Sequence, residues 1–134
     1  MERDSLSVPE TVVRDATGDQ ALPEMGVLEQ VWETDPIDPA DLDAATREAV
    51  ESLDWSGVPD GVEVAVGAGS RGIANLSTIV AGVVAAVRDL GYEPFVFPAM
   101  GSHGGATGEG QRAKLAALGV TESSVGCEIR SSMD

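Results

Sequence analysis

Residues 62–119 carry the pattern that most constrains what this chain folds into. The short apolar runs "VEVAV" (62–66) and "PFVFPAM" (94–100) are typical of buried strands. Between these runs, the apolar residues of 76–90 recur at helical spacing. A strand, a helix and a second strand in this order predict a right-handed crossover that leaves the two strands parallel.

Capping residues mark the ends of the expected helices. Asn75 is placed to cap the first helix, and Thr107 is placed to cap a second helix over 107–119. Gly91 and Gly119 follow the last periodic residues of the two helices and are expected to stop them. The boundaries of both helices are therefore predicted from local signals alone.

A third strand is expected at "CEIRSS" (127–132), after the second helix. The complete order, β-α-β-α-β, is that of a parallel sheet covered by helices. We therefore predict an α/β fold, a partial Rossmann-like parallel sheet with covering helices. Because the chain ends on a strand without a covering helix, we expect a C-terminal portion to be missing.

The N-terminal part is less regular. Residues 1–24 are polar and without a clear period, and we expect an extended or partly disordered lead-in. "MGVLEQVWE" (25–33) has the composition of an edge strand, and the α/β domain is expected to span 25–134. A helix is expected over 38–53, with Asp38 as its cap. Its predicted apolar face consists of Leu42, Ala45, Ala49 and Leu53.

The charge of the chain excludes two classes of partner. Its 134 residues hold 23 acidic and 8 basic side chains, for a net charge of −15. Nucleic acid and anionic membrane surfaces would be repelled, so neither is an expected partner. Lys114 is the only lysine, and an acid excess with so little lysine indicates adaptation to high salt. An ordinary acidic cytosolic protein is the alternative.

Cysteine usage and hydropathy point to a soluble cytoplasmic protein. Cys127 is the only cysteine, which excludes an intrachain disulfide and predicts a buried, unreactive thiol. The first ten residues are charged and lack the apolar run of a secretory signal. The longest apolar stretch, at about 79–87, is too short to span a bilayer.

Two loops are expected to meet at the carboxyl edge of the sheet. The loop after the first strand carries Ser70 and Arg71, and the loop after the second carries Ser102 and His103, the only histidine. Arginine offers a two-pronged fork to a carboxylate or phosphate, and histidine exchanges a proton near neutral pH. The small residues around His103 are expected to clear space for a ligand. The pair predicts a site for a small acid with a transferable proton, such as a 2-hydroxy acid.

"GAGSRG" (67–72) also matches the G-x-G-x-x-G dinucleotide fingerprint between a strand and a helix. That fingerprint expects an acidic residue at the end of the second strand, where this chain has "PAM" (98–100). The side chain of Arg71 would also crowd the pyrophosphate turn. A nucleotide-binding module that uses this loop to hold phosphate stays open as an alternative.

The same two loops resemble those of the nickel-dependent lactate racemase family, in its N-terminal domain. "GSRG" (69–72) is similar to the family's Thr-Arg loop after the first strand, and "MGSHGGAT" (100–107) to its Gly-x-His loop after the second. The longer string "PAMGSHGGATGEGQ" (98–111) is closer to an uncharacterised branch of the same superfamily. The resemblance covers about residues 62–132.

The resemblance implies a role for each loop residue. Arg71 would hold the substrate carboxylate, and His103 would be a catalytic acid/base group. In the family, a histidine removes the hydroxyl proton while hydride passes to a nickel-pincer nucleotide. The residues expected to contact such a cofactor are Ser70, Gly101, Ser102, Gly104, Gly105 and Thr107.

Several residues of the family's site have no counterpart in this chain. The racemases place an Asp and a His before the Thr-Arg pair, where Ala68 and Gly69 stand here. Their partner histidine, cofactor-anchoring lysine and nickel-binding histidine would lie beyond Asp134. We therefore predict the N-terminal part of a longer racemase-like protein that acts on a small 2-hydroxy acid and holds no metal or cofactor by itself. A truncated product without catalysis is the second alternative.

Overall fold

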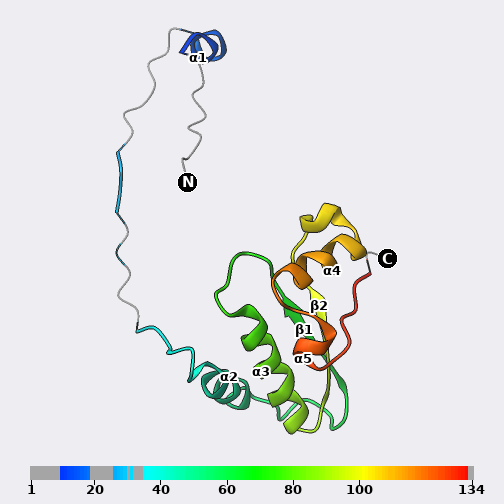
Figure 1. Ribbon diagram of the computed structural model, residues 1–134. Helices are drawn as coiled ribbons and strands as arrows, with labels where there is room; N and C mark the ends of the chain where they lie inside the picture. Colours follow the sequence, from blue (N-terminus) through cyan, green and yellow to red (C-terminus); the bar gives the residue numbers. More distant parts are fainter. Residues whose placement is uncertain (1–9, 19–25, 30, 32–34, 133–134) are drawn as a thin grey trace. The chain divides into compact units, whose positions relative to one another are not determined.

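The computed structural model describes residues 10–18, 26–29, 31 and 35–132 (Figure 1). The chain divides into two compact units, Met1–Thr34 and Asp35–Asp134. The expected end of the lead-in, at residue 24, lies outside the described residues. The sheet and the helices that pack on it belong to the second unit.

The first unit corrects two expectations. α1 (Glu10–Thr17) is a helix within the segment expected to be extended or partly disordered. Val12 and Ala16 stand four residues apart in it, which is the spacing of one helical face. Of the expected edge strand, the described residues 26–29 and 31 are not in a strand, and the side chain of Leu28 is exposed. A strand needs a hydrogen-bonded neighbour, and the described part of this unit provides none.

α2 (Leu42–Glu51) is shorter than the expected helix. The carboxylate of Asp38 accepts a hydrogen bond of 2.9 Å from the backbone N–H of Ala40, so it closes a turn before the helix and does not cap it. α2 packs on α3 (Leu76–Asp89) and buries Val50. The residues expected on the buried face instead line an open apolar groove beside α3: Leu42, Ala45, Ala49 and Leu53.

β1 (Glu63–Ala68) and β2 (Glu93–Pro98) form a two-stranded parallel sheet, with Val66 opposite Val96. Both strands lie where the apolar runs predicted them, and the predicted parallel pairing is confirmed. α3 connects the two strands, as the order of the elements required. The carboxyl ends of β1 and β2 therefore lie side by side.

α3 buries the face that its periodicity predicted. Leu76, Val80, Val84 and Val87 are buried and pack over the sheet. The expected stop at Gly91 is present, with a φ of +90°. Asn75 stands at the N-cap position, but its backbone is left-handed and its side chain makes no capping hydrogen bond, which corrects the expected cap. In the described part of the chain, no helix is long and apolar enough to cross a membrane.

The segment after β2 forms a 3₁₀ turn, η1 (His103–Ala106), and then α4 (Gly108–Ala117). The hydroxyl of Thr107 accepts a hydrogen bond of 3.1 Å from the N–H of Gly110, which confirms the expected cap. Gly119 ends this region with a φ of +81°, as expected. α5 (Glu122–Val125) is a short helix that the periodicity did not reveal, because four residues carry too little pattern.

The expected third strand at 127–132 is reduced to a single parallel bridge between Val96 and Ile129. The N–H of Val96 donates to Glu128, and the N–H of Arg130 donates to Val96. Pro94 and Pro98 stand two residues to either side of Val96 and face the same edge, where they offer no N–H. The ladder therefore cannot extend in either direction.

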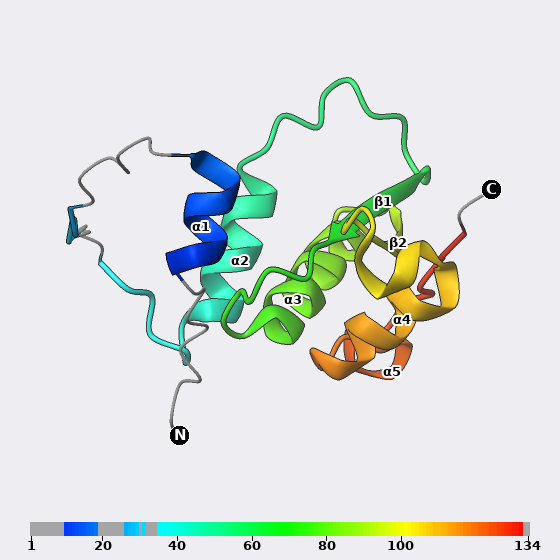
Figure 2. The ribbon, with the colours of Figure 1, turned by 90° about the horizontal axis from the view of Figure 1, so that it is seen from above.

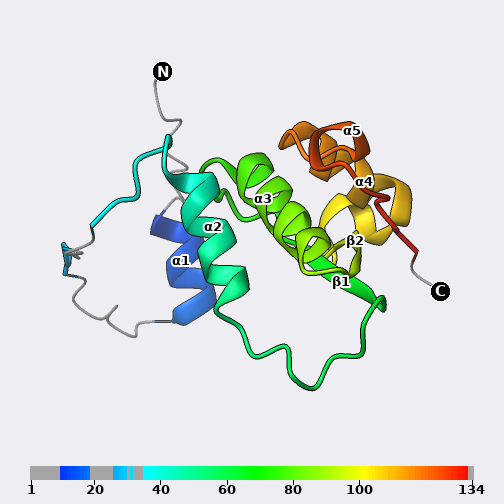
Figure 3. The ribbon, with the colours of Figure 1, turned by 90° about the horizontal axis from the view of Figure 1, so that it is seen from below.

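Figures 2 and 3 show α3, α4 and α5 on the same side of the two strands. On the opposite face of the sheet, the ring of Phe97 lies against Gly67, where a Cβ atom would approach it to 3.2 Å. The guanidinium of Arg130 stacks on the ring of Phe95, 4.1 Å from its centroid. The second unit is thus a mixed α/β structure with a two-stranded parallel sheet, its helices on one face and side chains of its own on the other.

Candidate functional site

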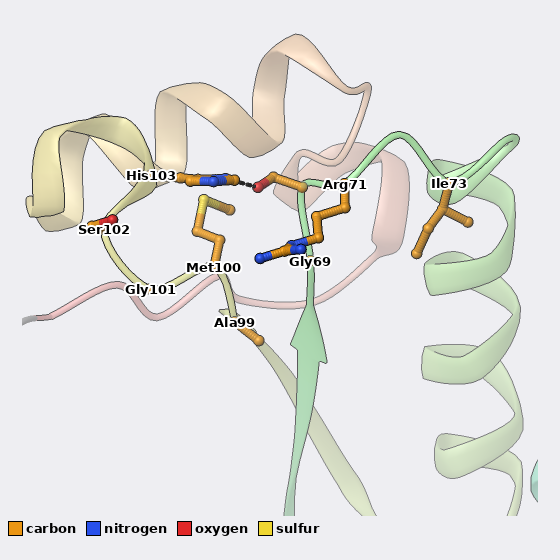
Figure 4. A pocket seen from close by; sticks show the side chains of 9 residues that line it. Gly69, Arg71, Ile73, Ala99, Met100, Gly101, Ser102 and His103 are labelled. Atoms are coloured by element: carbon orange, nitrogen blue, oxygen red, sulfur yellow. Dashed lines mark hydrogen bonds between the residues drawn. The ribbon is translucent and has the colours of Figure 1, made fainter. Parts of the chain in front are cut away.

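The two loops expected to form the site meet in one pocket at the carboxyl ends of β1 and β2 (Figure 4). The volume of this pocket is about 490 Å³. It contains the substrate-binding and catalytic candidates together with three of the six residues expected to contact a cofactor. Those lining residues are Ser70, Arg71, Gly101, Ser102 and His103.

A side-chain hydrogen bond joins the two loops. The hydroxyl of Ser70 and Nδ1 of His103 lie 2.5 Å apart, the bond drawn as a dashed line in Figure 4. His103 is exposed and Ser70 is half-buried. Because a neutral imidazole carries its proton on one nitrogen only, this bond leaves Nε2 as the nitrogen for a ligand. Sequence reasoning placed both residues at this edge but did not predict that they bond.

Arg71 differs from the other arginines of the second unit. It extends from the loop after β1 toward the backbone at Gly69 (Figure 4). Among the described residues it has no hydrogen bond or ion pair, although the chain holds 23 acidic side chains. The four other arginines of the unit each bond to a carboxylate or a backbone carbonyl: Arg47, Arg88, Arg112 and Arg130.

The electrostatics of the pocket run against those of the chain. The described residues that line it include Arg71 and His103 but no Asp or Glu. The net charge of the whole chain is −15, so a lining without acids is a local departure from its composition. A guanidinium without a protein partner at the mouth of such a pocket is available to an anion.

The remaining cofactor candidates shape the loop from outside the pocket lining. Gly104 and Gly105 have φ angles of +67° and +71° and form the 3₁₀ turn after His103. Thr107 caps α4. The backbone of Gly104 also lies directly against Gly110, with no room for a side chain. These glycines therefore fold the loop, and contact with a cofactor at these positions stays a prediction.

Sequence reasoning missed two features that hold the pocket in place. The amide of Gln111 in α4 is buried and donates a hydrogen bond of 2.7 Å to the carbonyl of Gly101. Met100 belongs to the buried core and also lines the pocket. The placement of Gln111 one helical turn after Thr107 is the signal that could have found it, because a side chain there turns back toward the preceding loop.

The glycines of "GAGSRG" are arranged differently from a phosphate-binding turn. Gly67 lies inside β1, under the ring of Phe97. α3 begins only at Leu76, four residues after Gly72, so the glycine pattern does not run directly into a helix N-terminus. This arrangement does not favour the dinucleotide fingerprint, which needs a tight turn that opens the helix.

The donor groups do not fit a nickel centre. No group of three or more His, Cys, Asp or Glu side chains that could hold a metal ion occurs in the part of the chain that the structure describes. Cys127 is half-buried, and burial raises the pKa of its thiol, which disfavours the thiolate that a metal needs. Lys114 is exposed on α4, outside the pocket lining. Steps that involve nickel therefore form no part of the chemistry derived below.

Comparisons with protein-family models, with curated proteins and with solved structures found no match to this chain.

Proposed function

We propose that this chain binds a small 2-hydroxy acid between its two loops and exchanges a proton with it. Arg71 holds the carboxylate through the parallel N–H groups of its guanidinium. His103 takes the proton of the 2-hydroxyl group on Nε2, and Nδ1 stays bonded to Ser70. The observation that carries this proposal is the pocket itself, in which an unpaired arginine and a histidine stand together without an acidic residue.

The finer fold and family assignments belong to the same proposal. We infer a partial Rossmann-like domain of the lactate racemase type. Its support is the position of the two loops at the carboxyl ends of adjacent parallel strands, where open α/β sheets bind ligands. The Ser-Arg and Gly-Ser-His sequences of these loops add to that support through the resemblance described above.

A racemase exchanges hydrogen on both faces of one carbon atom, and His103 is the only histidine of this chain. We therefore assign one part of such a site to this chain: the carboxylate fork and one proton-exchanging group. A second acid/base group and the group that accepts the hydride come from elsewhere in this proposal. Binding of the acid, unlike turnover, does not require those groups.

Calorimetric titration with L-lactate and D-lactate tests the binding. We expect saturable binding by the wild type and affinity about 10- to 100-fold weaker in Arg71→Ala, because a hydrogen bond to a charged group contributes roughly 1.5–3 kcal/mol. Arg71→Lys should lie between them, since it keeps the charge but loses the fork. Lactamide, which lacks the carboxylate, should not bind.

Lys114→Ala is the matched control. It removes one positive charge from an exposed residue outside the pocket lining and should bind lactate as the wild type does. Equal losses in Arg71→Ala and Lys114→Ala would contradict the proposal, because they would reduce the effect to net charge. Tight binding of NAD or ATP together with no binding of lactate would favour the nucleotide-binding alternative.

A further inference from the structure

Ser70 stands between the two functional groups of the pocket. It precedes Arg71 in the loop after β1, and its hydroxyl bonds across 33 positions of sequence to Nδ1 of His103. It is half-buried and lines the pocket itself. One oxygen atom is therefore placed to contact a bound carboxylate and the imidazole at the same time.

The direction of the Ser70–His103 bond decides what His103 can do. If Ser70 donates its hydrogen to Nδ1, a neutral ring carries its own proton on Nε2 and cannot accept one there. If Nδ1–H donates to Ser70, Nε2 carries a lone pair and is a base. The hydroxyl of serine can serve in either direction, because it has one hydrogen and two lone pairs.

A carboxylate near Arg71 would select one of these two directions. An ionised carboxylate accepts hydrogen bonds but donates none, and its bonds with hydroxyl donors are about twice as strong as neutral ones. With the hydrogen of Ser70 turned toward the anion, only its lone pairs face Nδ1. Nδ1 must then carry the proton of a neutral ring, and Nε2 becomes the base.

We propose that Ser70 couples the carboxylate of the ligand to the tautomer of His103, so that binding of the anion itself prepares the histidine to accept a proton. This inference rests on the proposed function, because it takes the ligand to be a small carboxylate. Ser70 is a positioning residue in this scheme. No bond other than hydrogen bonds forms or breaks, and the one proton that moves on the ring passes through solvent from Nε2 to Nδ1.

The fact that the chain has one histidine makes the tautomer directly measurable. In protein with ¹⁵N-labelled histidine, at about pH 9 where an imidazole is neutral, the two ring nitrogens report which of them carries hydrogen. We expect saturation with L-lactate to raise the ratio of the Nδ1–H form to the Nε2–H form about tenfold, the effect of one hydrogen bond. Ser70→Thr, which keeps a hydroxyl, should show the same change.

Two alanine variants separate coupling from a general effect of the loop. Ser70→Ala should bind lactate with a tautomer ratio that lactate leaves unchanged. Ser102→Ala, which removes a neighbouring hydroxyl in the same pocket, should retain the full change. Calorimetry on the same samples measures binding independently of the tautomer.

The two failures are distinguishable. Lactate that binds to the wild type without a change in the tautomer ratio would overturn the coupling and leave the proposed function standing. An equal change in Ser70→Ala and wild type would also overturn it, since the anion would then act without Ser70. Absence of lactate binding to the wild type would contradict the proposed function and the coupling together.

Discussion

Gly104 and Gly105 are neighbours in the chain, yet they are required for different physical reasons. Both have left-handed backbones, with φ angles of +67° and +71°. A Cβ atom on Gly104 would lie 2.4 Å from the backbone carbon of Gly110, whereas a Cβ atom on Gly105 would meet nothing within 4 Å. Gly105 is needed only for its backbone conformation, and Gly104 is needed also for the close approach of η1 to α4.

This difference predicts unequal costs for two similar substitutions. Gly105→Ala should lower the free energy of unfolding by about 1–2 kcal/mol, the usual cost of a left-handed backbone with a side chain. Gly104→Ala should lower it by several times as much, because the backbone of η1 or α4 must also shift. Urea unfolding of both variants measures the difference.

Gly57→Ala provides the reference for that measurement. Gly57 has open space around it and no left-handed φ, so the substitution should change stability little. Equal losses in Gly104→Ala and Gly105→Ala would mean that the turn gives way without disturbing α4. The close packing of the two elements would then not be what requires Gly104.

At the scale of elements, α4 and α5 close the edge of the sheet. Ile129 bridges to β2, and its own N–H and C=O face the other way. Its N–H donates to the carboxylate of Glu122 at 3.3 Å, and its carbonyl accepts a hydrogen bond from Arg112. Arg112 and Glu122 also pair with each other at 2.8 Å. Two side chains thus take the positions that a further strand would occupy, which protects the edge from pairing with other chains.

The Glu122 contact predicts a pH dependence of stability. Hydrogen bonds from Arg112 and then from the N–H of Ile129 hold the pKa of the Glu122 carboxyl below its usual value. The stabilisation is therefore complete above the ordinary pKa of an unfolded glutamate, about 4.3, and is lost as the pH falls through the lower folded value. Glu122→Gln should be less stable than wild type at neutral pH, and the gap should close in acid.

Urea midpoints measured from about pH 7 to pH 2 test this expectation. Glu48→Gln is the matched control, because Glu48 is an exposed glutamate of α2 whose side chain makes no ion pair in the described residues. That variant should follow the wild-type curve. A constant gap between wild type and Glu122→Gln across the whole range would show that the lost contact is not ionic.

For the whole molecule, excess negative charge is the dominant electrostatic feature. The chain carries 23 acidic and 8 basic residues. The ion pairs within the described residues are exposed ones made by Arg47, Arg112 and Arg130, and exposed pairs contribute little to stability. Repulsion among the unpaired carboxylates therefore outweighs these attractions, and salt screens both.

We accordingly expect the melting temperature to rise as KCl increases from low to multimolar concentration. Thermal unfolding followed by circular dichroism across a KCl series measures this. Repeating the series near pH 4 supplies the control, since the calculated isoelectric point is about 4.1 and the repulsion there is small. A melting temperature that stays flat or falls with salt at neutral pH would contradict the proposed adaptation to high salt.

Much of the fold and part of the site follow from local sequence. The positions of β1, α3, β2 and α4, the cap at Thr107 and the stop at Gly91 depend on contacts within a few residues, which the sequence displays directly. The meeting of the Arg71 and His103 loops follows from the order strand, helix, strand. The prolines at 94 and 98 also limited the third strand, but their effect depends on which edge of β2 they face.

The tertiary structure alone decided which side chains found partners. The bond between Ser70 and His103, the isolation of Arg71 among many carboxylates, and the closing of the edge at Ile129 all join residues far apart in the sequence. Such contacts depend on how the elements pack, and periodicity and capping carry no record of that packing. The sequence by itself determined where the candidate groups gather, and packing determined which of them a ligand can use.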